Sequence, residues 1–191
     1  MRSIPSGNRR LAAAVLVALS AATVPGLASA TVDWTLDGNV GYDTNPGRVS
    51  HDPKGSATLY GGGTLTVDES RPRLDAKVGA NVGYLEYLTG GYGGQPLGSA
   101  SADLRYALIP KTLFWSLDDR FGQGTSNVLA PASPSNRVNV NTFSTGPSLV
   151  LPLNSVTRMQ ADARYGIDTF GGGTLPDDTR YTGSLGLIRQ M

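Results

Sequence analysis

The residues best suited to chemistry in this sequence are few and widely spaced. The single histidine, His51, is followed by Asp52, and Asp43 lies in the same segment rich in glycine and proline. A histidine beside a carboxylate can act as the base that activates a serine or cysteine nucleophile. The chain has no cysteine, and no serine around His51 lies in a sequence that resembles a nucleophile site. We therefore predict no catalytic residue and no enzymatic activity.

Adjacent acidic residues and glycine runs are the other candidates for a binding site. Asp118-Asp119 and Asp177-Asp178 would point to opposite faces of a strand, and neither pair has the ligand spacing of a calcium loop. The runs "GGYGGQ" and "FGGGT" are not followed by a helix that could place its N-terminus against a phosphate. The sequence thus predicts no metal site and no cofactor site.

Oppositely charged residues recur at a spacing of two, which is a stronger pattern. Residues two apart on a β-strand project from the same face, so each pair would lie side by side. Such pairs are found on a solvated surface of mixed charge, and also in a charge-paired interior of a barrel. The four pairs are Asp75/Lys77, Asp103/Arg105, Asp118/Arg120 and Asp162/Arg164.

Strands must position these pairs, because apolar and polar residues alternate strictly around them. In "RLDAKVGANVGYLEY", residues 73–87, Leu74, Val78 and Tyr84 share one parity, while Asp75 and Lys77 share the other. A period of two over such a length is typical of a β-strand with two chemically different faces. No segment has the pattern of an amphipathic helix, which predicts an all-β fold. The eight candidate strands are near residues 34–42, 57–67, 73–87, 99–108, 113–121, 143–153, 157–168 and 180–190.

The connections between these strands alternate between long and short. Long links rich in Gly, Pro, Asn and Ser follow the first, third, fifth and seventh strands, and tight links such as "IPK" follow the others. Outer-membrane barrels have this arrangement, with short periplasmic turns and long outer loops. We predict an antiparallel transmembrane β-barrel of about eight strands, or the N-terminal half of a larger barrel. A secreted or periplasmic soluble β-domain is the alternative.

The first 30 residues predict a secretory signal peptide. Arg2, Arg9 and Arg10 precede a short apolar run at 11–24, and "ASA" at 28–30 is a small-residue cleavage site. The domain expected to remain, residues 31–191, has 13 basic and 15 acidic residues and a net charge of −2. Such a chain has no basic surplus to attract nucleic acid.

Three segments together carry a resemblance to a known group of proteins. They are "WTLDGNVGYDTNP" (34–46), "RPRLDAKVGANVGYLEY" (71–87) and "LFWSLDDRFGQGTSN…NRVNVNTFSTGPSLVLPL" (113–153). In this order they resemble the outer-membrane β-barrel proteins associated with PEP-CTERM and exosortase exopolysaccharide systems, within the putative β-barrel porin group. Members are usually longer, so an end at "GLIRQM" is consistent with a truncated member. The resemblance supplies no catalytic or ligand residue.

Together these observations predict a location in the outer membrane, reached by the general secretory route. The expected partners are outer-membrane lipid, the barrel assembly machinery and exopolysaccharide or export components. The expected function is that of an accessory of exopolysaccharide export at the cell surface, or of a structural and interaction barrel. A porin-like channel for small solutes is the alternative, and it is disfavoured because the interior of an eight-stranded barrel is filled by side chains.

Overall fold

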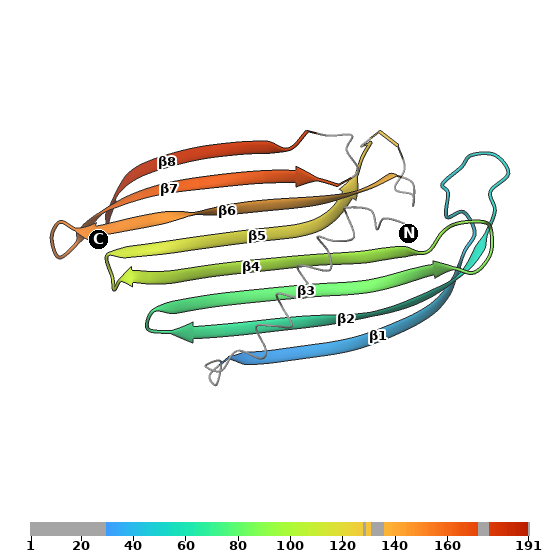
Figure 1. Cartoon of the computed structure of the whole chain (residues 1–191), viewed down its shortest axis with the longest axis horizontal. Coiled ribbons are helices and arrows are strands. Elements are labelled where there is room, and N and C mark those ends of the chain that lie inside the picture. Colours follow the sequence, from blue (N-terminus) through green and yellow to red (C-terminus); the bar gives the residue numbers. More distant parts are fainter. Residues whose placement is uncertain (1–29, 128, 131–135, 172–175, 191) are drawn as a thin grey trace, which may run out of the picture.

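A single antiparallel sheet of eight strands forms the protein, in the chain order β1 to β8 (Figure 1). The structure is a computed structural model, and it describes residues 30–127, 129–130, 136–171 and 176–190. The described part of the chain contains no helix, so the predicted all-β fold with eight strands is confirmed. The strands are β1 (Thr31–Asp43), β2 (Ser56–Arg71), β3 (Leu74–Tyr87), β4 (Gln95–Ile109), β5 (Leu113–Thr125), β6 (Arg137–Pro152), β7 (Thr157–Phe170) and β8 (Asp178–Arg189).

The predicted alternation of connection lengths is also confirmed. Tight turns at 72–73, 110–112 and 153–156 follow β2, β4 and β6. The longer connections after β1, β3, β5 and β7 all lie at the other end of the sheet (Figure 1). The two ends of the sheet therefore differ, since one has tight turns and the other has longer loops.

The strand registers give the sheet two continuous faces of different chemistry. Residues that are paired between antiparallel strands project from the same face. Val67 pairs with Val78 on one face, and the neighbouring Asp68 pairs with Lys77 on the other. The same division continues through all seven strand pairs, so that an apolar face and a polar face run from β1 to β8.

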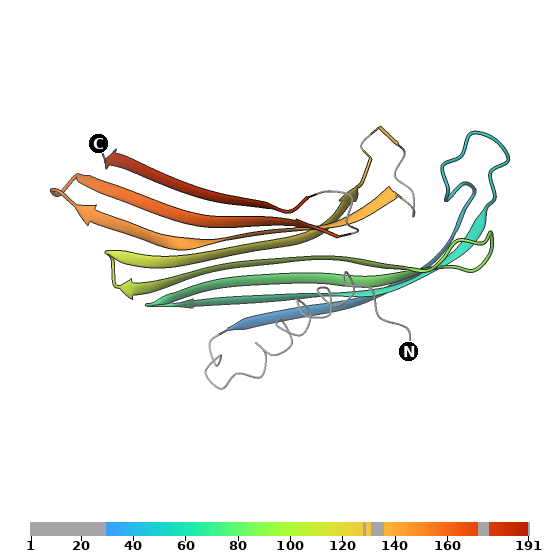
Figure 2. The ribbon, with the colours of Figure 1, turned by 45° about the horizontal axis from the view of Figure 1, so that its top comes forward.

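The sheet is a curved single layer, and no other described element covers either face (Figure 2). Only three hydrophobic residues of the described chain are buried, namely Val67, Ala107 and Val138. The sheet is also open, because β1 and β8 form its two edges. The apolar face thus has no protein core to pack against.

Two regions differ in detail from the sequence expectations. Glycines inside a strand often mark a bend, yet the Gly61–Gly63 run lies inside β2 and pairs with both neighbouring strands. The strand expected near 143–153 begins earlier, since β6 starts at Arg137, includes Val138 and Val140, and keeps one register with β5. The two valines project from the polar face, so the alternation of apolar residues, and not the strand, is interrupted there.

The ladder between β6 and β7 is interrupted at Gly146 and Pro147. Pro147 has no N–H to donate, and the pairing resumes between Ser148 and Asp162. The Arg164 guanidinium donates from Nη1 to the carbonyl oxygens of Pro147, at 2.7 Å, and Ala163, at 2.9 Å. These bonds satisfy backbone acceptors where the ladder is broken.

Gly146 is expected to be the glycine of the sheet that tolerates substitution least. A Cβ atom at Gly146 would meet the carbonyl oxygen of Ala163, which belongs to the backbone and cannot rotate away. We expect Gly146→Ala to lower the free energy of unfolding by ~1–3 kcal/mol, the usual cost of overpacking. Gly122→Ala is the matched control, since a Cβ there meets no atom within 4 Å. Urea unfolding followed by tryptophan fluorescence measures both, and equal losses would contradict this account.

Candidate functional site

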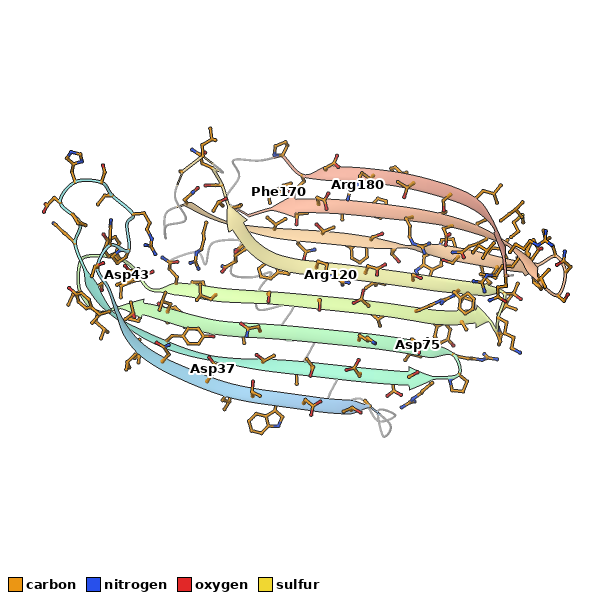
Figure 3. All side chains as sticks on the ribbon, turned by 180° about the vertical axis from the view of Figure 1, so that it is seen from behind. Asp37, Asp43, Asp75, Arg120, Phe170 and Arg180 are labelled. Atoms are coloured by element: carbon orange, nitrogen blue, oxygen red, sulfur yellow. The ribbon has the colours of Figure 1, made fainter. Side chains whose placement is uncertain are left out.

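The polar face has a cluster of charged side chains at its centre, on β3, β4 and β5 (Figure 3). We call Lys77, Asp103, Asp118 and Arg120 the central charge cluster. Arg120 donates from Nη2 to Oδ1 of Asp103, and from Nη1 to the carbonyl oxygens of Ala102 and Asp119. Asp118 lies directly opposite Asp103, and Lys77 lies opposite Asp103 on the other side.

The predicted pairs are therefore arranged differently from the simple spacing of two. Arg120 forms its ion pair across the strands with Asp103, not along its strand with Asp118. Arg105 lies over the ring of Phe114, 3.9 Å from its centroid, which is a cation–π contact. Asp75 accepts a hydrogen bond of 2.8 Å from the hydroxyl of Ser70. Lys77 and Asp75 share the polar face without a hydrogen bond between them in the described chain.

A second cluster surrounds Arg164 on β6, β7 and β8. Asp162 and Arg164, one of the predicted pairs, approach to 3.5 Å. Ser148 lies between them, because its hydroxyl donates to Asp162 at 2.6 Å and accepts from Arg164 at 2.7 Å. Gln160 and Ser184 also donate to Asp162, at 3.0 Å and 3.4 Å. We call these five residues the Arg164 cluster.

Sequence reasoning found the charged members of these clusters but missed their cross-strand partners. The roles of Ser70, Ser148 and Ser184 depend on register, and register cannot be read from the spacing within one strand. The ion pair of Arg180 with Asp168, at 3.0 Å between β8 and β7, was missed for the same reason. The carboxylates of Asp103 and Asp162 are held by structural partners, which suits charge pairing better than proton transfer.

The apolar face has exposed large side chains on β1 to β5, β7 and β8, although Val67 on the same face is buried. Its large side chains include Trp34, which is 68% exposed, and Leu185, which is 74% exposed. Polar side chains interrupt this face over β5 and β6, where Asn141 donates to Asp119 at 2.9 Å and Gln123 donates to Asn139 at 3.0 Å. Asp119 lies on this face because it is adjacent to Asp118, as the parity of β5 indicated.

An open hollow of about 410 Å³ lies on the apolar face over β5 to β8. Trp115 donates from Nε1 to the hydroxyl of Thr145 at 2.8 Å, and the rings of Tyr165 and Tyr181 are 5.4 Å apart. These four residues form its walls, and small residues such as Ala163 form its floor. The hollow suits contact with apolar chains or rings, and it was not predicted because its residues are distant in sequence.

Two of the longer connections pack together at the loop end of the sheet. Ser56 is fully buried there, and its hydroxyl accepts a hydrogen bond of 3.1 Å from the amide of Thr89. The ring of Tyr92 lies 5.6 Å from the ring of Tyr87 and close to Gly47. The connections 44–55 and 88–94 thus form one joined surface, which we call the loop platform.

His51 lies on this platform in an exposed position. Its Nδ1 is 3.0 Å from the hydroxyl of Ser50, the preceding residue. Neither ring nitrogen is paired with a carboxylate in the part of the chain that the structure describes. A serine and a histidine without an orienting acid lack the geometry of a nucleophilic triad.

Within the described ranges, no three His, Cys, Asp or Glu residues gather as metal ligands. The predicted signal peptide lies almost wholly outside the described residues, which begin at residue 30. No helix in the described part of the chain is long and apolar enough to cross a membrane.

Comparisons with known proteins found no match. No family model, no curated protein and no solved structure matches the chain.

Proposed function

We propose that the protein is an outer-membrane β-barrel protein whose apolar sheet face lies against lipid and whose polar face lines the interior. One observation carries this proposal: a single-layer sheet has one apolar face with exposed large side chains on β1 to β5, β7 and β8, and no described element covers that face. In water such a face would favour aggregation, whereas in a bilayer it is the required surface. The soluble β-domain is disfavoured, because a sandwich would need a second sheet over this face.

The division of the connections supports an orientation. Tight turns follow β2, β4 and β6, as at the periplasmic end of outer-membrane barrels, and the loop platform is at the opposite end. We place the loop platform outside the cell. A platform held by the buried Ser56 presents a fixed surface to partners.

Within this class, the function we propose is that of an accessory of exopolysaccharide export at the cell surface, or of a structural and interaction barrel, without catalysis. Serine, arginine and carboxylate side chains on the polar face are paired with each other, which suits a filled interior. The expected partners are the barrel assembly machinery and exopolysaccharide or export components. The porin alternative requires an open interior, and no observation favours it.

The experiment that tests the proposed class places tags at both ends of the sheet. The full chain is produced in a bacterium with an outer membrane, with a short epitope inserted after Pro53 in the loop platform, or after Pro110 in a tight turn. We expect both variants in the outer-membrane fraction, with antibody labelling of intact cells only for the Pro53 insertion. Recovery in the soluble periplasmic fraction would contradict the proposal, and labelling of only the Pro110 insertion would reverse the orientation.

A further inference from the structure

The two edge strands of the sheet, β1 and β8, each have one side without a hydrogen-bonded partner strand. Every residue of β1 from Thr31 to Tyr42 is exposed, and nearly all of β8 is exposed as well. An open edge presents unpaired N–H and C=O groups, which cannot remain unsatisfied in lipid. If the apolar face lies against lipid, as we proposed above, each edge needs a strand as its partner.

The direction of the strands makes β1 and β8 suitable partners for each other. All seven pairings are antiparallel and the number of strands is even, so β8 runs opposite to β1. An antiparallel pair between them would continue both faces of the sheet without a break. The parity of the residues must be kept, because a shift of one residue would turn the apolar side chains of one strand inward.

The stagger of the strands indicates how such a closure would be offset. Following the strand registers straight across the sheet from Thr31, the first residue of β1, leads to Arg180, near the start of β8. Thr31 lies at the tight-turn end of the sheet. β8 reaches the same end near Ile188, which is eight residues after Arg180. The row consists of Thr31, Asp68, Lys77, Asp103, Asp118, Ser144, Gly166 and Arg180.

This offset is one of those that a closed barrel of eight strands can adopt. With ~3.3 Å per residue along a strand and ~4.8 Å between strands, an offset of eight residues over eight strands gives a tilt of roughly 35°. Closed barrels have strand tilts of about 35–45°. An offset of six would give a tilt of roughly 27°, below this range, and an offset of ten would give roughly 41°.

Side-chain pairing distinguishes the offsets of eight and ten. With an offset of ten, Asp43 would lie opposite Asp178, and Asp33 opposite Ile188. On the apolar face, an offset of eight places Trp34 opposite Leu185 and Val32 opposite Leu187, and an offset of ten places Trp34 opposite Leu187 and Leu36 opposite Leu185. Both offsets thus form stabilising apolar pairs, but only the offset of ten places like charges directly opposite each other, which is destabilising.

Charges on the polar face agree with the offset of eight. On this face β1 has three aspartates and no basic residue, whereas β8 has Arg180 together with Asp178; Arg189 belongs to the other parity. In this register Arg180 lies opposite Asn39 and diagonal to Asp37, within reach of a long side chain. Arg180 already pairs with Asp168 and is 56% exposed, and its five N–H groups leave donors for Asp37. Figure 3 labels Asp37 on the β1 edge and Arg180 on the β8 edge.

We propose that β1 and β8 of the same chain are each other's partners, and that they pair with Trp34 opposite Leu185 and Asn39 opposite Arg180. This inference deepens the proposed function, on which it rests for the lipid that surrounds the wall. Closure turns the polar face into the interior of an eight-stranded barrel, where the central charge cluster and the Arg164 cluster face each other. Side chains fill an interior of this size, so the closed chain conducts no solute.

Two cysteines introduced into a chain without native cysteine test the register. In Trp34→Cys/Leu185→Cys the Cβ atoms would be close enough for a disulfide, whereas in Trp34→Cys/Leu187→Cys they would be displaced by two residues. Val32→Cys/Leu187→Cys tests the same register and keeps Trp34 in place. The full-length proteins are refolded in liposomes at a low protein-to-lipid ratio and oxidised. Gels without reductant, and the mass after thiol alkylation, then distinguish bonds within one chain from bonds between chains.

We expect disulfides within one chain for the two matched pairs, formed at least tenfold faster than for the displaced pair. Covalent dimers would show that a second copy occupies the edges, and free thiols in folded protein would show that the edges do not meet; either overturns the proposal. Faster bonding of the displaced pair overturns the register. Flotation of the same samples keeps the proposals apart: protein that floats without bonding refutes closure alone, and protein that bonds within one chain without floating refutes only the membrane location.

Discussion

Leu65→Arg is expected to lower the free energy of unfolding in a bilayer by ~2–4 kcal/mol, the cost of an arginine on the lipid face near the middle of the membrane. Leu65 lies near the middle of β2, opposite Trp34 on β1 and Ala80 on β3, and all three project from the apolar face. An arginine there would have to place its guanidinium in hydrocarbon or distort the bilayer to reach water.

Thr66→Arg is the matched control for this change. Thr66 is the next residue of the same strand and projects from the polar face, between Asp33 on β1 and Gly79 on β3. The added arginine would meet a carboxylate and no lipid, so we expect a clearly smaller loss than for Leu65→Arg. Reversible urea unfolding in liposomes, followed by tryptophan fluorescence, measures both variants. Equal and small effects would mean that both faces meet water, which would refute the lipid-facing wall.

The two-faced strands could be predicted because side-chain alternation is a local property. The parity of Leu74, Val78 and Tyr84 identifies one face of β3, and the structure places these residues on the apolar face. Turn chemistry is also local, which is why the tight links "IPK" and "LNS" are correctly located between strands. These patterns need no knowledge of which strand lies beside which.

The pairing of charges could not be predicted, because it depends on the offset between strands. Asp103 and Arg120 are on different strands, and they meet only because Asp103 lies opposite Asp118 in the register of β4 and β5. The partner of the backbone groups at Pro147, where the β6–β7 ladder is interrupted, also depends on a neighbouring strand. A proline in an alternating segment predicts a missing donor, but only the structure identifies Arg164 as the group that satisfies the carbonyls around it.

The central charge cluster gives the second prediction with a large effect. Arg120→Met removes the guanidinium that bonds Asp103, and it leaves the carboxylates of Asp103 and Asp118 directly opposite each other. In the open sheet Arg120 is 49% exposed, so water would screen much of this repulsion. In a closed interior the same carboxylates lose most of their water, and breaking a buried pair costs ~3–5 kcal/mol.

We therefore expect Arg120→Met to destabilise the folded protein in liposomes by ~3 kcal/mol or more. Asp118→Asn in the same chain should return ~1–2 kcal/mol of this loss, since it removes one of the two facing charges, and coupling of this size is usual for residues in contact. Arg48→Met, which removes the exposed ion pair with Asp43 at 3.8 Å, is the control and should cost less than ~1 kcal/mol. Urea unfolding of the unchanged protein and of these three variants forms the measurement. If Arg120→Met costs no more than Arg48→Met, the polar face meets bulk water, and the closed interior would be refuted even if the Leu65 variant supports the lipid-facing wall.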